Sequence, residues 1–153
     1  MILLAAVIVL VIVFRRELEA ATVPPKDLGE NGGTMEDRIQ RISRAIARQE
    51  GFYILNSRAY RNHNPGNLTL DITGGGIGIG YDGAYVIYPD DESGWADLHA
   101  QVRMMLTGTS RFYKPWMTIR EVSKIYTATQ QDAWSRNVAS FLGVSEDTKL
   151  SEV

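Results

Sequence analysis

The chain contains no cysteine in its 153 residues and only two histidines. The lack of cysteine excludes a disulfide framework, a thiol nucleophile and a zinc–thiolate site. His63 and His99 lie far apart and outside any His-Glu-x-x-His pattern, so the sequence gives little support to a metal centre. Sixteen basic and eighteen acidic residues leave a formal charge of -2, which argues against nucleic acid as a partner.

Charged residues are absent from positions 1–14, which form an apolar run closed by Arg15 and Arg16. As a helix this run would be about 21 Å long, shorter than the ~30 Å hydrocarbon core of a bilayer. Its apolar residues occupy every face, which favours a lipid-exposed segment over a buried core helix. A secretory signal normally carries basic residues before its apolar run; none is present here, although Ala20-Ala21 offers a cleavage site. We predict that residues 1–16 are a membrane anchor contacting the membrane through residues 1–14, with a removed signal as the alternative.

Residues 17–33 have the composition of a flexible linker. Pro24-Pro25 disfavours a helix, and the Gly-Glu-Asn-Gly-Gly run at 29–33 loosens the chain. A flexible coil of this length spans about 20–25 Å, enough to hold a domain off a membrane surface. The remaining residues, 34–153, suffice for one domain with a hydrophobic core.

The first predicted helix of this domain places an acid at its end. Ile39, Ile42 and Ile46 are spaced three and four residues apart and form one apolar face. At about 100° per residue, Glu50 falls on that face, and Gly51 stops the helix. Apolar surroundings and the partly negative carbonyl end of a helix both disfavour an ionised carboxylate. A carboxyl group that stays protonated near neutral pH is what a general acid requires; a solvated helix-end glutamate is the plainer alternative.

Residues 61–68 read Arg-Asn-His-Asn-Pro-Gly-Asn-Leu, a composition typical of tight turns with free side-chain amides. Together with Ile-Ala-Arg-Gln-Glu-Gly-Phe at 46–52, this segment resembles the core of the lysozyme-like superfamily of phage and bacterial cell-wall lytic proteins, which includes many lytic transglycosylases. In that family a glutamate closes a helix, and a short loop leads to an Asn-Pro-Gly-Asn-(Leu/Ile) turn and a small hairpin. The resemblance covers residues 34–150.

The resemblance implies an α+β lysozyme-like fold, peptidoglycan as the substrate and Glu50 as the catalytic acid. Asn64 and Asn67 would position the sugar or orient Glu50. Tyr126 matches a family tyrosine that approaches the cleft, although the proline-rich continuation expected after it is replaced by Thr-Ala-Thr-Gln-Gln. For this tyrosine and for three others expected to stack on sugar faces, plain packing is the alternative; the three are Tyr53, Tyr60 and Tyr81.

The rest of the domain is predicted to be mostly helical with a small three-stranded antiparallel sheet. The strands are expected at 68–72, 77–81 and 85–88, separated by a glycine-rich turn and an Asp-Gly turn. Helix starts are expected at Thr34, in the acidic run at 90–92, and at Thr118 and Thr129, each followed by apolar residues at helical spacing. We expect the cleft between the sheet and the helices.

A hydrolase of the lysozyme type would need a second carboxylate near the acid. Asp71 alternates with Leu70 and Ile72 and is the candidate, although aspartate beside a glycine-rich turn is common for turn reasons alone. Asp82 precedes a glycine and is better explained as part of a hairpin turn. Without a convincing second acid, we expect a lytic transglycosylase that cleaves the β-1,4 bond between N-acetylmuramic acid and N-acetylglucosamine with one glutamate; a muramidase is the alternative.

A rival from another class is a non-catalytic lysozyme-like component of a virion or envelope. Basic residues lie only on the C-terminal side of the apolar run, which favours a cytoplasmic location for that side and conflicts with a substrate outside the cell. A protein carried in a phage membrane avoids this conflict. We therefore expect a membrane-anchored lysin of a virion membrane or bacterial inner membrane, whose partners are peptidoglycan strands, the membrane and other virion proteins. No cofactor is implied.

Overall fold

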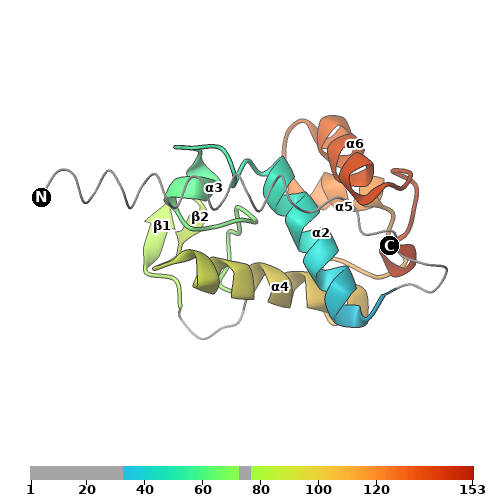
Figure 1. Cartoon of the computed structure of the whole chain (residues 1–153), viewed down its shortest axis with the longest axis horizontal. Coiled ribbons are helices and arrows are strands. Elements are labelled where there is room, and N and C mark those ends of the chain that lie inside the picture. The colour runs from blue at the N-terminus through green and yellow to red at the C-terminus, as the bar shows by residue number, and fades with distance from the viewer. Residues whose placement is uncertain (1–32, 73–76) are drawn as a thin grey trace, which may run out of the picture.

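The computed structural model describes residues 33–72 and 77–153. Along the chain these residues form the elements labelled in Figure 1: helices α2 (Met35–Gln49) and α3 (Arg58–Arg61), strands β1 (Gly80–Asp82) and β2 (Tyr85–Ile87), helices α4 (Asp91–Thr107), α5 (Ile119–Tyr126) and α6 (Gln131–Leu142), and the 3₁₀ helix η1 (Leu150–Glu152). The predicted α+β class, mostly helical with a small antiparallel sheet, is confirmed. The predicted anchor lies outside the described residues, as does the predicted linker apart from Gly33.

Helix boundaries follow capping residues in the sequence. The Thr34 hydroxyl accepts the Asp37 N–H at 3.2 Å, and the Asp37 carboxylate accepts the Thr34 N–H at 3.0 Å. Thr118 begins α5 with the same reciprocal cap. The predicted start of α6 at Thr129 is wrong, because the N-cap is Gln130, which has a left-handed φ of 55° and makes no side-chain capping hydrogen bond.

Among the residues that the structure describes, the sheet has two strands rather than the predicted three. β1 and β2 pair antiparallel. Residues 68–72 do not form a strand. A backbone hydrogen bond from the Val86 N–H of β2 to the Leu68 carbonyl at 2.9 Å joins the segment to the hairpin, but side chains take the N–H groups of Leu68 and Ile72. The Leu68 N–H donates to Oδ1 of Asn64 at 2.7 Å, and the Ile72 N–H donates to the buried carboxylate of Asp97 at 2.7 Å. This segment is therefore held in place by polar side chains from the loop before it and from α4.

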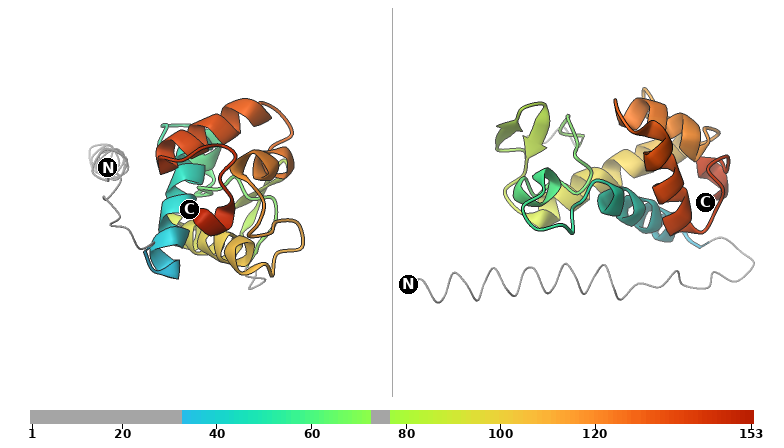
Figure 2. Two further views of the ribbon diagram at one scale, coloured as in Figure 1. Left: turned by 90° about the vertical axis from the view of Figure 1, so that its right-hand side faces the viewer. Right: turned by 90° about the horizontal axis from the view of Figure 1, so that it is seen from above.

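Helix α2 is the centre of the core. It packs against α4 and α6, and α5 packs on α6. The predicted apolar face of α2 is buried, since Ile39, Ile42 and Ile46 are each at most 2% exposed. The hairpin and α3 lie at one end of the domain and α5 and α6 at the other, while α2 and α4 run between them (Figures 1 and 2). Within residues 33–72 and 77–153, no helix is both long and apolar enough to cross a membrane.

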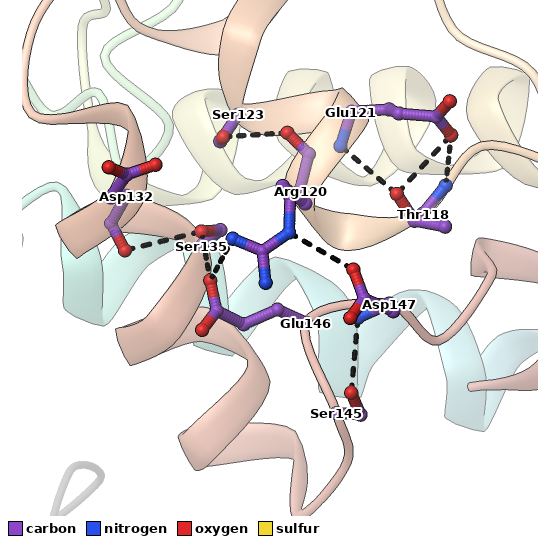
Figure 3. Close-up of polar contacts among 9 residues, drawn as sticks. All are labelled: Thr118, Arg120, Glu121, Ser123, Asp132, Ser135, Ser145, Glu146 and Asp147. Carbon is purple, nitrogen blue, oxygen red and sulfur yellow. Dashed lines mark hydrogen bonds and ion pairs between the residues drawn. The ribbon is translucent and has the colours of Figure 1, made fainter.

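Charged and hydroxyl side chains join α5 and α6 to the segment that follows α6 (Figure 3). Arg120 of α5 pairs with Glu146, with Nη1 3.3 Å from Oε2, and with Asp147, with Nε 3.0 Å from Oδ1. Ser135 of α6 donates its hydroxyl to Oε2 of the same glutamate at 2.6 Å. Exposed ion pairs stabilise a fold only slightly. Here they fix the position of α6 relative to α5, because the Glu146 carboxylate contacts Ser135 of α6 and Arg120 of α5.

Candidate active site

Glu50 is the residue at which α2 ends. The helix closes at Gln49, and Glu50 is its C-cap, with its N–H bonded to the Ile46 carbonyl at 2.8 Å. Gly51 follows with a φ of 77°, a left-handed conformation that glycine adopts without the steric penalty of a side chain. The glycine turns the chain away from the helix axis, and the Glu50 side chain remains partly exposed at the helix end.

Both oxygens of the Glu50 carboxyl group accept hydrogen bonds from distant parts of the chain. Nδ2 of Asn67 donates to Oε2 at 2.9 Å, and Nε1 of Trp134 donates to Oε1 at 2.8 Å. Asn67 belongs to the loop between α3 and β1, whereas Trp134 belongs to α6. Two segments far apart in the sequence therefore meet on one side chain, and two donors hold its carboxyl group in one orientation.

The loop at 62–67, which presents Asn67, is held by buried contacts. Asn64 is fully buried, and its amide donates to two backbone carbonyls at 2.9 Å each. Helix α4 approaches the loop so closely that a Cβ at Gly94 would lie 1.8 Å from the His63 carbonyl oxygen. Asn67 itself has a φ of 45°, in the left-handed region that asparagine occupies more readily than most residues. A supported loop thus aims the Asn67 amide at Glu50.

Three aromatic rings pack in a row beside this carboxyl group. The ring centroids of Trp134 and Tyr126 are 5.0 Å apart, and those of Tyr126 and Tyr113 are 6.2 Å apart. The Tyr126 hydroxyl donates to the Gly66 carbonyl at 2.8 Å, which links α5 to the loop at 62–67. Burial, with the charge of Glu50 as a second cause, raises the pKa of Tyr113 to about 12 and that of Tyr126 well above its ordinary value. Both phenols therefore lie within electrostatic reach of the carboxyl group.

These surroundings raise the pKa of Glu50 above its ordinary value of 4.5. Burial is the largest cause, because an apolar environment penalises the charged form. The hydrogen bonds from Asn67 and Trp134 lower the pKa, because they stabilise the ionised carboxylate, but they do not cancel the effect of burial. Glu50 therefore keeps its proton to higher pH than a solvated glutamate, in the direction that the apolar helix face predicts.

The other residues predicted to contact substrate occupy different environments. Asn64 is buried and bonded to the backbone, so we assign it to support of the loop and no longer to the sugar. Tyr81 on β1 is 62% exposed, whereas Tyr53 and Tyr60 are half-buried. Tyr53 lies edge-on to the neighbouring phenylalanine ring at 5.5 Å. Tyr126 packs on Trp134 beside Glu50, and its ring and hydroxyl contacts fit the packing alternative. Its contact with substrate stays a prediction.

Asp71, the predicted second carboxylate, lies beside the segment that leads to β1. Its Oδ2 accepts the Gly78 N–H at 3.3 Å, and its charge contributes to the raised pKa of Tyr88. Tyr88 in turn donates its hydroxyl to the buried Asp97 at 2.5 Å. For Glu50, by contrast, the causes of the raised pKa are burial and two hydrogen bonds, and no carboxylate of the described chain is among them. The hydrogen bond to Gly78 and the effect on Tyr88 thus place the Asp71 carboxylate beside the hairpin.

Trp134 and Tyr113 are the site residues that the sequence did not predict. Trp134 fits the apolar stripe of α6, and its hydrogen bond joins residues 84 positions apart, so no local spacing could indicate it. Tyr113 lies in the loop between α4 and α5, where there is no periodic pattern. One signal was available for Trp134, because a buried indole N–H generally requires an acceptor.

Within the part of the chain that the structure describes, no group of three or more histidine, aspartate or glutamate side chains is placed to hold a metal ion. Comparisons with models of protein families, with curated proteins and with solved structures find no match to this chain. A functional assignment therefore depends on the geometry around Glu50 and on the sequence resemblance at 46–68.

Proposed function

We propose that this chain is a lytic transglycosylase with a lysozyme-like domain, and that it cleaves the β-1,4 bond between N-acetylmuramic acid and N-acetylglucosamine in peptidoglycan. The observation that carries the proposal is the carboxyl group of the partly exposed Glu50, which has a raised pKa and is held by two donors from distant parts of the chain. One of these donors, Asn67, belongs to the Asn-Pro-Gly-Asn turn on which the family resemblance depends.

In the proposed reaction, Glu50 donates its proton to the glycosidic oxygen as the bond breaks and an oxocarbenium-like centre develops on the muramic acid sugar. The sugar's acetamido group stabilises that centre. Its 6-hydroxyl then attacks C1, and the ionised Glu50 accepts the hydroxyl proton. The products are a free 4-hydroxyl on the leaving sugar and a 1,6-anhydro muramic acid end, with no water consumed.

A muramidase is the second candidate. A retaining hydrolase places a second carboxylate ~5–5.5 Å from the acid, where it acts as nucleophile. The predicted candidate for that role, Asp71, accepts a hydrogen bond from the Gly78 N–H and contributes to the raised pKa of Tyr88. These contacts favour a mechanism with one carboxyl group.

We expect Glu50→Gln to abolish lysis of purified cell wall without unfolding the protein. Glutamine keeps the shape of the side chain but cannot deliver a proton, and general acid catalysis typically contributes ~10²–10⁴-fold. Zymography of the full chain, with a melting curve for each variant, measures both effects. Equal clearing by the folded variant and the wild type would remove Glu50 from the role of the acid.

Mass spectrometry of the digest separates the two reactions. Anhydro muropeptides are the expected products, and Asp71→Asn should still release them at a rate close to that of the wild type. Products heavier by one water, with free reducing ends, would identify a muramidase, and loss of activity in Asp71→Asn would then make Asp71 its second carboxylate.

The rival is a non-catalytic lysozyme-like module of a virion or envelope. Binding of the full chain to cell-wall sacculi without release of any soluble fragment would support that rival. As part of the proposal, we place the protein in a virion membrane or bacterial inner membrane, anchored through residues 1–16, with its domain acting on the glycan strands of the wall.

A further inference from the structure

The two oxygens of the Glu50 carboxyl group meet donors of different kinds. Oε1 accepts the indole N–H of Trp134, and Oε2 accepts the side-chain amide of Asn67. An indole nitrogen can only donate a hydrogen bond, whereas an amide carries a donor and an acceptor that exchange places when it rotates by a half-turn. The side of the carboxyl group that faces Asn67 can therefore change from acceptor to donor, and the side that faces Trp134 cannot.

The Asn67 amide has an unused acceptor in the site. Its Oδ1 is buried and accepts no hydrogen bond from any described residue. Buried side-chain oxygens nearly always have a partner. A half-turn about the Cβ–Cγ bond would bring this oxygen against Oε2 of Glu50, where a protonated carboxyl group would satisfy it. In the orientation that the structure shows, Nδ2 donates to Oε2 at 2.9 Å and to the Glu50 backbone carbonyl at 3.5 Å, and so matches the ionised form. The half-turn gives up the longer of these two hydrogen bonds.

We propose that Trp134 is a positioning residue, which keeps Oε1 as an acceptor in both protonation states, so that the acidic proton resides on Oε2 against a reversed Asn67 amide. The inference rests on the proposed function only for the assignment of Glu50 as the acid. It adds which oxygen carries the proton and which residue imposes that choice.

Trp134 is well fixed for this role. Its side chain is 3% exposed and packs on Tyr126, with ring centroids 5.0 Å apart. The next residue, Ser135, is bonded to Glu146, which Arg120 of α5 also contacts (Figure 3). The indole is therefore held from its own helix and from α5.

The titratable groups that face Glu50 from neighbouring elements are the phenols of Tyr113, in the loop before α5, and Tyr126, in α5. Burial raises the pKa of both, so neither phenol gains a charge near neutral pH. On its own helix, the nearby Arg48 lies over the ring of Phe141. Of these groups, the one that changes its charge below the titration range of the phenols is therefore Glu50 itself.

The direct test is NMR spectroscopy of the full chain in detergent micelles, in which the Trp134 indole N–H, the Asn67 side-chain amide and the ¹³C-labelled Glu50 carboxyl are followed through the titration of Glu50. Loss of signals in Trp134→Phe and Glu50→Gln assigns the resonances. We expect the indole proton to stay protected from water exchange on both sides of the midpoint and the Asn67 amide signals to shift across it. Glu50→Gln, whose side-chain NH₂ imitates the protonated Oε2, should show the low-pH pattern at every pH. Loss of indole protection at low pH, or an Asn67 amide that does not respond, would overturn the proposal.

Trp134→Phe keeps an aromatic ring and removes the N–H. We expect the Glu50 midpoint to move to higher pH, because a hydrogen bond to the ionised form is lost. The alkaline limb of the kcat profile should move with it, and kcat should fall roughly ten- to hundredfold, because the acid is no longer aimed, with little change in KM. Trp116→Phe, at an indole that is 65% exposed, is the matched control and should change none of these quantities.

The outcomes separate the two proposals. If the NMR pattern is as expected but no glycan is cleaved, the proposed function fails and the positioning of the proton stands. If the wall is cleaved but Trp134→Phe leaves the Glu50 titration unchanged, the positioning role fails alone. Should Trp134→Phe not fold, the wild-type and Glu50→Gln spectra still show whether the Trp134 indole stays protected and whether the Asn67 amide responds to the protonation of Glu50.

Discussion

The Glu50 carboxyl group couples the pH of the solution to the stability of the fold. Because its pKa is raised in the folded state, the folded protein holds a proton over a pH range in which the unfolded chain has already lost it. That range begins near the ordinary value of 4.5 and ends at the folded pKa. The stability that the protonated group contributes is fully present below this range and is lost as the pH rises through the folded pKa.

We therefore expect Glu50→Gln to be more stable than the wild type in neutral and mildly alkaline buffer. Glutamine has no charge to bury, so the penalty of the ionised carboxylate disappears. The difference in melting temperature should shrink as the pH is lowered and vanish below about pH 4.5, where the wild type is also neutral. Thermal unfolding followed by circular dichroism across this range measures it.

The matched control for this prediction is Glu36→Gln in the first turn of α2. Glu36 is half-exposed and pairs with Arg103, with Oε2 2.6 Å from Nη2. Removing its charge should lower stability slightly, by at most ~1 kcal/mol, as for other exposed ion pairs. A wild type that is more stable than Glu50→Gln at alkaline pH would show that the buried carboxylate carries no net penalty.

Among the elements, those defined by local signals could be predicted from the sequence. Capping by Thr34 and Thr118 uses residues three positions away, and Gly108 ends α4 in a left-handed conformation with a φ of 76°. The β1–β2 hairpin turns at Gly83 and Ala84, one residue beyond the predicted turn at Asp82-Gly83. Each of these features depends on a few neighbouring residues.

Features that depend on distant partners could not be predicted in the same way. In the segment expected to form the third strand, the Ile72 N–H donates to Asp97 of a later helix and not to a neighbouring strand. In the site, Glu50 and Asn67 could be associated through the motif resemblance, since both belong to one short stretch. The indole of Trp134 reaches Glu50 only after α6 has packed on α2, and the sequence contains no local trace of that contact.

The start of α6 offers a stabilising substitution. Gln130 occupies the N-cap with a φ of 55° and makes no capping hydrogen bond, a conformation that costs most non-glycine residues ~1–2 kcal/mol. We expect Gln130→Gly to raise the free energy of unfolding by roughly 0.5–1 kcal/mol. Glycine removes the steric penalty of the left-handed conformation, but it also makes the unfolded chain more flexible, which cancels part of this stabilisation. Thermal unfolding of the full chain measures the change.

Asn56→Gly is the control for that substitution. Asn56 has a similar φ of 64°, but asparagine tolerates this region better than glutamine does. The gain there should be smaller than at Gln130. A lower melting temperature for Gln130→Gly would show that the glutamine makes a contribution at the helix start that its backbone conformation does not reveal.

At the scale of the whole chain, the proposed function requires the domain to be delivered to the wall while attached to a membrane. We expect residues 1–14 to remain on the mature protein and to insert into lipid, with each Leu, Ile or Val contributing ~0.3–0.6 kcal/mol. Mass spectrometry of the protein recovered from its native particle or membrane gives the mature mass. A chain that begins near Ala21 would identify a removed signal instead.

A substitution in the same segment tests insertion directly. Ile8→Arg places a charge in the middle of the apolar run, at a cost of ~2.5–3.5 kcal/mol for a membrane-centred arginine. The variant should move from the membrane fraction to the soluble fraction on flotation, while the melting temperature of the domain stays the same. Retention of the variant in the membrane fraction would indicate that another part of the protein provides the attachment.

The burial of Trp134 also gives the protein an optical property. Of its three tryptophans, Trp116 is 65% exposed, whereas Trp134 is 3% exposed and donates its indole N–H to the Glu50 carboxyl group. Iodide in the solvent quenches an exposed indole and leaves a shielded one emitting, so the emission that survives quenching comes from Trp134 together with the half-buried Trp95. A glycan that bonds to the Glu50 carboxyl group changes the electric field at the Trp134 indole. Binding can therefore be followed in the intrinsic fluorescence of the unlabelled protein, in a Trp116→Phe background and with unlabelled wall fragments.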